Sequence, residues 1–100
     1  MKTFYTDTVR DFIYKRFLNI QSEQYWTDEN SYYFALILKD RFPSGTICYA
    51  VEEKYFVFLR DGVYYSYSGI VLPTGTVVQW DNLFEYNRNL YDEVLKKFYF

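Results

Sequence analysis

The sequence contains no histidine and a single cysteine, Cys48. Without histidine, hydrolases of the Ser-His-Asp and Cys-His classes are excluded, as are haem sites with histidine ligands and zinc sites of the Cys/His type. One cysteine cannot form a disulfide within the chain, which fits a reducing compartment. We expect Cys48 to be buried in a strand as a small hydrophobic residue.

Long apolar segments and an excess of basic charge are also missing. No apolar run approaches the ~20 residues that span a bilayer, and the first twelve residues, MKTFYTDTVRDF, lack the hydrophobic region of a signal peptide. The net charge of −2 provides no basic surface for duplex DNA. We therefore expect a cytoplasmic protein without a membrane partner, and we regard single-stranded nucleic-acid binding as the weakest alternative.

Aromatic residues, by contrast, are abundant: 13 Tyr, 10 Phe and 2 Trp make up a quarter of the 100 residues. A chain of this length that is half hydrophobic can bury a real core, and we expect residues 1–100 to form a single domain. So many tyrosines cannot all be buried, because each hydroxyl needs a hydrogen-bond partner. Some tyrosines should therefore lie at the surface, where this residue type is frequent in protein-binding sites.

Three helical segments are predicted. Apolar residues at helical spacing predict a helix from about 7 to 20. Thr27 predicts the N-cap of a second helix, which should end by Phe42 because Pro43 disfavours α geometry in the residue before it. Asn82 and Glu85 form the pattern of a capping box for a C-terminal helix, and the segment 87–89 favours a break within it.

The region between the second and third helices predicts strands. Residues 46–51 and 55–59 are rich in β-formers, and Asp61-Gly62 is a strong hairpin turn that pairs Leu59 with Tyr64. One sheet face should then carry Tyr55, Val57, Leu59, Tyr64 and Ser66, and the other Phe56, Phe58, Val63, Tyr65 and Tyr67. Residues 70–72 and 76–80 predict a shorter hairpin at the edge. The expected fold is α+β, with N-terminal helices packed on an antiparallel sheet of three to five strands and a C-terminal helix.

Residues 25–69 carry a pattern of aromatic, acidic and small residues: Tyr25-Trp26, Glu29-Asn30, Tyr32, Phe34-Ala35, Phe56, Tyr64-Tyr65 and Gly69. This pattern resembles that of small phage and bacterial papain-like cysteine hydrolases, approximately YW-x-x-E-N-C-Y-x-F-A, then G-H-F on one strand and Y-Y-D-x-x-G on the next. The resemblance implies a papain-like core, in which the first turn of a helix faces an antiparallel sheet.

The three catalytic positions of that family are occupied by other residues here. Ser31 stands at the position of the nucleophilic Cys, Tyr55 at that of the base His and Ser66 at that of the orienting Asp. A serine nucleophile needs a base, and tyrosine, with an ordinary pKa of ~10, is a poor base at pH 7. The leading hypothesis is therefore a catalytically inactive domain. The alternative is a hydrolase or transferase that uses Ser31 or carboxylates in the same cleft.

The candidate binding residues are acidic and aromatic. If the family arrangement holds, the pairs Asp28-Glu29 and Glu52-Glu53 approach one rim of the cleft, around Tyr32 and Tyr55. Such a rim predicts a partner protein with a basic surface. The hairpin tyrosines Tyr64 and Tyr65 are further candidates.

The same carboxylates could hold Mg²⁺ or Ca²⁺. We favour a simpler interpretation, in which Asp28-Glu29 serve a helix N-terminus and Glu52-Glu53 lie in a solvated turn, and we expect no metal or cofactor. The resemblance to phage proteins further suggests an inhibitor, encoded by a phage or mobile element, of a host factor such as a defence nuclease.

Overall fold

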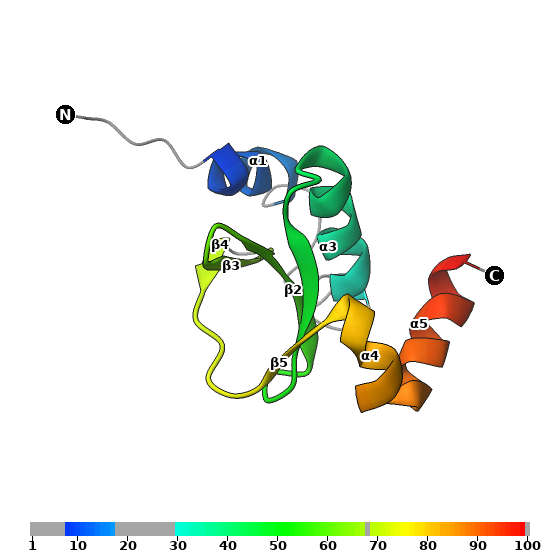
Figure 1. Ribbon diagram of the computed structural model, residues 1–100. Helices are drawn as coiled ribbons and strands as arrows, with labels where there is room; N and C mark the ends of the chain where they lie inside the picture. Colours follow the sequence, from blue (N-terminus) through cyan, green and yellow to red (C-terminus); the bar gives the residue numbers. More distant parts are fainter. Residues whose placement is uncertain (1–7, 18–29, 68, 100) are drawn as a thin grey trace.

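The computed structural model describes residues 8–17, 30–67 and 69–99, and these form an α+β fold (Figure 1). The predicted cap Thr27, together with Asp28 and Glu29, and residues 18–20 of the first predicted helix lie outside the described residues. The described part contains helices α1 (Thr8–Phe17), α3 (Asn30–Arg41), α4 (Trp80–Tyr86) and α5 (Arg88–Tyr99), and strands β1 (Thr46–Ala50), β2 (Tyr55–Arg60), β3 (Val63–Ser66), β4 (Gly69–Val71) and β5 (Val77–Gln79).

The five strands form one antiparallel sheet in the order β4-β3-β2-β1-β5. Strands β1 to β4 follow each other as a meander, and β5 returns to pair with β1 at the far edge. The β2–β3 hairpin has the predicted register, with Leu59 opposite Tyr64. Both turn residues adopt positive φ, 53° at Asp61 and 79° at Gly62, a conformation that Asp and Gly tolerate better than most residues. This prediction is therefore confirmed.

The prediction of a hairpin between residues 70–72 and 76–80 is wrong. β4 pairs with β3 and β5 pairs with β1, so the two strands lie at opposite edges of the sheet. The connection between them crosses from one edge to the other (Figure 1). Pairing with β5 supplies backbone partners to β1, and the bond from Val51 N–H to the Thr76 carbonyl, at 3.0 Å, extends this pairing.

Helix α3 covers one face of the sheet and lies alongside β2 (Figure 1). Its fully buried side chains Phe34, Ala35 and Leu38 join the main hydrophobic core, to which α1 adds Val9 and Ile13. α3 ends at Arg41, as Pro43 predicts. The C-terminal turn is closed by Lys39, whose ammonium donates to the carbonyls of Pro43 (2.8 Å) and Gly45 (2.6 Å).

The other face of the sheet carries a second apolar cluster. Cys48, Ala50 and Val57 are fully buried there. Partly buried hydrophobic residues pack against them: Tyr55, Leu59, Tyr64, Val71 and Val77. The face that the sequence assigned to Tyr55, Val57, Leu59 and Tyr64 is therefore confirmed, as is the burial of Cys48.

The C-terminal helical region is broken at Asn87, as the sequence predicts, but it does not begin with the predicted capping box. α4 starts at Trp80, and its N-cap residue, Gln79, makes no side-chain cap. Asn82 lies inside the helix. The helix starts earlier because the backbone turns directly from β5 into α4, where Trp80 packs against the core.

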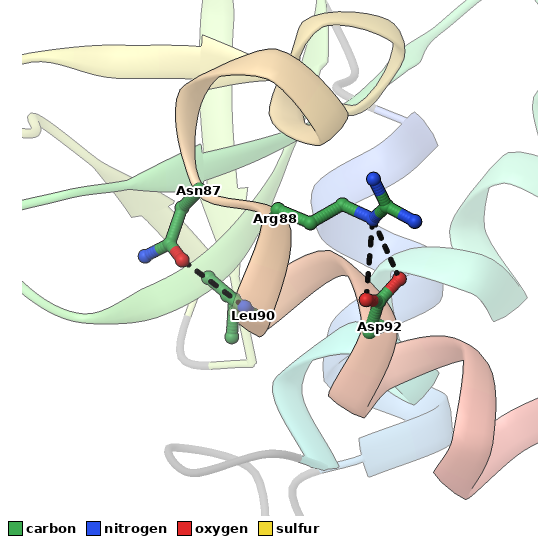
Figure 2. A network of polar contacts seen from close by, with 4 residues as sticks. All are labelled: Asn87, Arg88, Leu90 and Asp92. Atoms are coloured by element: carbon green, nitrogen blue, oxygen red, sulfur yellow. Dashed lines mark hydrogen bonds and ion pairs between the residues drawn. The ribbon is translucent and has the colours of Figure 1, made fainter.

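One residue serves both C-terminal helices (Figure 2). The N–H of Asn87 donates to the carbonyl of Leu83 at 2.8 Å, the last helical hydrogen bond of α4, and the non-helical backbone of Asn87 (φ −150°, ψ 87°) ends the helix. Its side-chain Oδ1 accepts a hydrogen bond from the N–H of Leu90 at 3.1 Å, which is the N-cap interaction of α5. In the first turn of α5, Arg88 Nε donates to both carboxylate oxygens of Asp92 at 3.2 Å. The two contacts of Asn87 join α4 to α5, whereas the Arg88–Asp92 pair lies within α5.

We expect Gly45→Ala to destabilise the protein. A methyl group at this buried position would collide with the ring of Phe58, whose side chain is itself fully buried. Overpacking of this kind costs about 1–3 kcal/mol of unfolding free energy, which chemical denaturation would measure.

Gly75→Ala is the matched control. The atoms nearest to its new methyl group would be those of the Glu52 side chain, which is exposed and can turn away. An equal loss of stability in both variants would contradict the proposed packing of Gly45 against Phe58.

Candidate functional site

Ser31 lies in the first turn of α3, but its hydroxyl is not presented to solvent. The residue is 2% exposed, and its Oγ accepts a hydrogen bond of 2.8 Å from the backbone N–H of Phe56. This bond joins the beginning of α3 to the beginning of β2. The described contacts of Ser31 are therefore those of a structural residue.

Tyr55 and Ser66, at the other two positions of the family pattern, lie on the same face of the sheet, as the hairpin register requires. Tyr55 packs against the second apolar cluster, and Ser66 is buried. Burial, and to a smaller degree the negative charge of Glu53, raises the pKa of Tyr55 above its ordinary value. The phenol therefore stays protonated at neutral pH and cannot serve there as a general base.

The buried thiol of Cys48 is equally unsuited to nucleophilic chemistry. Burial raises the pKa of Cys48 to about 11, so the thiol stays protonated at neutral pH. A thiol reacts as its thiolate, and Cys48 is completely inaccessible. Its contribution to the protein is packing.

The predicted acidic pair in the β1–β2 turn has two separate environments. Glu52 is exposed, in agreement with a solvated turn. Glu53 departs from that prediction, because its Oε2 accepts hydrogen bonds of 3.0 Å from both the N–H and the hydroxyl of Thr74. These bonds tie the β1–β2 turn to the connection between β4 and β5. Sequence alone does not reveal the contact, because its two partners are distant in the chain.

The tyrosines predicted for the binding site differ in how much surface they offer. Tyr32 and Tyr65 are 1% and 3% exposed and belong to the main core. Tyr55 and Tyr64 are partly buried against the second cluster. Among the predicted binding residues that the structure describes, Glu52 is exposed, and Glu53, Tyr55 and Tyr64 are partly exposed.

A chain of aromatic contacts that the sequence interpretation missed leads from the core to the surface at α4. The ring of Tyr32 lies 4.9 Å from that of Trp80, which stacks on Tyr91 at 4.9 Å with an interplanar angle of 25°. Tyr91 in turn meets the edge of Phe84 at 5.3 Å. Each such pair contributes about 0.5–1.5 kcal/mol beyond burial, so these rings form a well-supported group.

The outer end of this chain is a surface of aromatic and acidic residues. Phe84 and Tyr86 are 42% and 52% exposed. Tyr49 of β1 is a neighbour of Tyr86, and the pKa of Tyr49 is raised first by burial and then by Tyr86. We call Tyr49, Phe84 and Tyr86, together with Trp80 and Tyr91, the α4 aromatic surface; Phe84 and Tyr86, two residues apart, leave α4 in different directions.

Charged side chains border the α4 aromatic surface. Asp81 and Glu85 of α4 are exposed. The guanidinium of Arg88 lies over the ring of Phe84, 4.3 Å from its centroid, and is ion-paired with Asp92. The spacing of Trp80 and Phe84 by four residues was the available sequence signal, because residues four apart share one face of a helix.

Comparisons with protein-family models, with curated proteins and with solved structures found no match to this chain. Of the helices that the structure describes, none has the length and apolar character needed to cross a membrane. Within residues 8–17, 30–67 and 69–99, no group of three or more Cys, Asp or Glu side chains is placed to hold a metal ion.

Replacing Ser31 by alanine should reduce stability. The N–H of Phe56 would lose its acceptor inside the protein, and a buried unsatisfied donor costs about 1–3 kcal/mol. Urea unfolding of Ser31→Ala should show this loss. Ser44→Ala is the control, since the hydroxyl of Ser44 is bonded at an exposed site and its removal should cost less than about 0.5 kcal/mol. Equal losses would mean that the Ser31–Phe56 bond is not the source of the effect.

Glu53 should make the stability of the protein depend on pH in the acid range. Its pKa is lowered first by the Thr74 backbone hydrogen bond, so folding favours the ionised carboxylate. The stabilisation is complete above the ordinary value of 4.5 and disappears as the pH falls through the lower folded-state pKa. In Glu53→Gln this contribution should be absent. Unfolding curves of the two proteins should therefore differ near neutral pH and converge in acid. A difference that is independent of pH would contradict the assignment.

Proposed function

We propose that this chain is a non-catalytic protein-binding domain whose contact site is the α4 aromatic surface. The observation that carries the proposal is the continuous aromatic contact from buried Tyr32 through Trp80 and Tyr91 to exposed Phe84. Rings held by other rings lose little conformational freedom on binding, and tyrosine and tryptophan are frequent in binding hot spots. The surface is thus suited to bind a second protein without rearrangement.

A non-catalytic role is supported by the residues at the family's catalytic positions. The Ser31 hydroxyl is buried and bonded to the backbone of β2. The raised pKa of Tyr55 keeps the phenol protonated, so it cannot activate a nucleophile at neutral pH. The alternative function, a hydrolase or transferase that uses Ser31, would need a base to activate the hydroxyl, and the described contacts of Ser31 include none.

The charge of the surface favours a basic partner. Asp81 and Glu85 border the aromatic rings, and the charge of Arg88 is balanced by Asp92. Acidic groups at the rim of an interface attract a basic partner and increase the rate of association. The net charge of the chain, −2, has the same sign.

The evolutionary origin and the cellular role that we propose rest on the sequence resemblance. We propose descent from a papain-like hydrolase domain, and a role in the cytoplasm as an inhibitor encoded by a phage or mobile element. A host defence nuclease would offer a basic nucleic-acid groove as the partner surface.

The double substitution Phe84→Ala and Tyr86→Ala tests the contact site. A partner captured with the wild-type chain from host cells would be purified, and its affinity for each variant measured by biolayer interferometry. We expect at least about tenfold weaker binding, mainly through faster dissociation, because central aromatic residues dominate interface energies.

The matched control replaces Ile70 and Leu72 by alanine, since these side chains are also apolar and exposed but belong to β4 and the segment after it. The control should bind like the wild type. If Phe84→Ala with Tyr86→Ala also binds like the wild type, the α4 site is wrong, and Glu52 with Tyr55 becomes the next candidate. Labelling of Ser31 by a fluorophosphonate probe would contradict the non-catalytic role.

A further inference from the structure

A different surface lies at the C-terminal end of α3. Phe42 directly follows the helix, is 8% exposed, and packs edge to face against Phe12 of α1, with ring centroids 5.7 Å apart. Two arginines lie on this phenylalanine: the Cζ atoms of Arg41 and Arg60 are each 5.1 Å from the centroid of the Phe42 ring. Arg41 also lies 5.9 Å from the centroid of Phe12.

A third cation, Lys15, completes the group. Lys15, Arg41, Phe12 and Phe42 line a surface cavity of about 280 Å³, together with Thr8 and Asp11. We call Phe12, Lys15, Arg41, Phe42 and Arg60 the basic aromatic cluster. Its cations come from α1, α3 and β2, so the fold brings together charges that are far apart in the sequence.

The cations of this cluster lack a close ion-pair partner within the described part of the chain. None of Lys15, Arg41 and Arg60 forms an ion pair there. The described hydrogen bond of Arg60 runs from Nε to the hydroxyl of Ser44 at 3.2 Å. Both guanidinium groups lie at a cation–π distance from the Phe42 ring, and a guanidinium has several N–H groups that can bind a carboxylate in a bidentate manner. The ring of Phe42 thus brings two such groups close to one another.

We propose that the basic aromatic cluster binds an acidic segment of a partner protein, with Arg41 and Arg60 each bound to a carboxylate. This surface is separate from the α4 aromatic surface and opposite to it in charge, so the inference does not depend on the function proposed above.

Carboxylates of a protein fit this cluster better than a nucleic acid does. The affinity of nucleic acids grows with the number of phosphates that the protein neutralises, and the cluster offers three cations in a chain with a net charge of −2. Asp11 lines the same cavity, and Asp61 follows Arg60 directly in the hairpin turn. These carboxylates limit the negative charge that the cluster can accept, which favours a short acidic segment over a long polyanion.

The test uses a fluorescein-labelled hexaglutamate peptide and fluorescence anisotropy at low ionic strength. We expect the wild-type chain to bind the peptide and the double variant Arg41→Gln with Arg60→Gln to bind it at least about tenfold more weakly. The control, Lys96→Gln with Lys97→Gln, removes the same charge from α5 and should stay within about threefold of the wild type. Failure of the wild-type chain to bind, or equal losses in both double variants, would overturn the proposal.

A second variant separates the bidentate contact from simple charge and from folding. Arg41→Lys with Arg60→Lys keeps both positive charges but removes the planar groups, so its peptide affinity should also fall by at least about tenfold. Its thermal unfolding is compared with that of the wild type. Full peptide binding by this folded variant would overturn the assignment of the arginines. Tighter binding of a single-stranded oligothymidylate than of the peptide, lost in the same variants, would instead identify a nucleic-acid surface.

Discussion

The hydrogen bond from the N–H of Phe56 to the hydroxyl of Ser31 determines where α3 meets the sheet. The bond is buried, and it fixes a position because a buried donor that loses its acceptor costs about 1–3 kcal/mol. Ser31 is followed by Tyr32, whose ring meets Phe56 at 5.2 Å and Trp80 at 4.9 Å. The place of the aromatic group is therefore set by the start of α3, and the same bond gives Ser31 a structural role.

The α4 aromatic surface depends equally on the junction between α4 and α5. Tyr91 stacks on Trp80 only if α5 turns back beside α4, and Asn87 sets this turn by ending one helix and capping the next. The Arg88–Asp92 pair is exposed and contributes little to stability by itself. Its role is to hold the arginine over Phe84, where the cation adds to the order of the exposed ring. Local backbone chemistry at one asparagine thus determines the shape of a surface made of residues from several elements.

The sequence predicted those features that depend on local chemistry and missed those that depend on distant pairing. Pro43 ends α3, and Asp61-Gly62 sets the hairpin register and with it the faces of β2 and β3, because each acts within a few residues. Pairing of β5 with β1, the bond between Glu53 and Thr74 and the stacking of Trp80 on Tyr91 join segments whose approach is a result of the whole fold. The prediction of an Asn82 cap failed for the same reason, since tertiary packing of Trp80 moved the start of α4.

The two surfaces proposed for binding lie at opposite ends of one rigid element. α4 lies near the N-terminal end of α3 and α1 near its C-terminal end (Figure 1). α3 has 12 residues, and at 1.5 Å per residue it separates these ends by roughly 18 Å. That distance exceeds the reach of a small ligand but lies within a single protein interface, which typically involves ~20–30 residues on each side. Because the helix is packed on the sheet along its length, the separation stays constant.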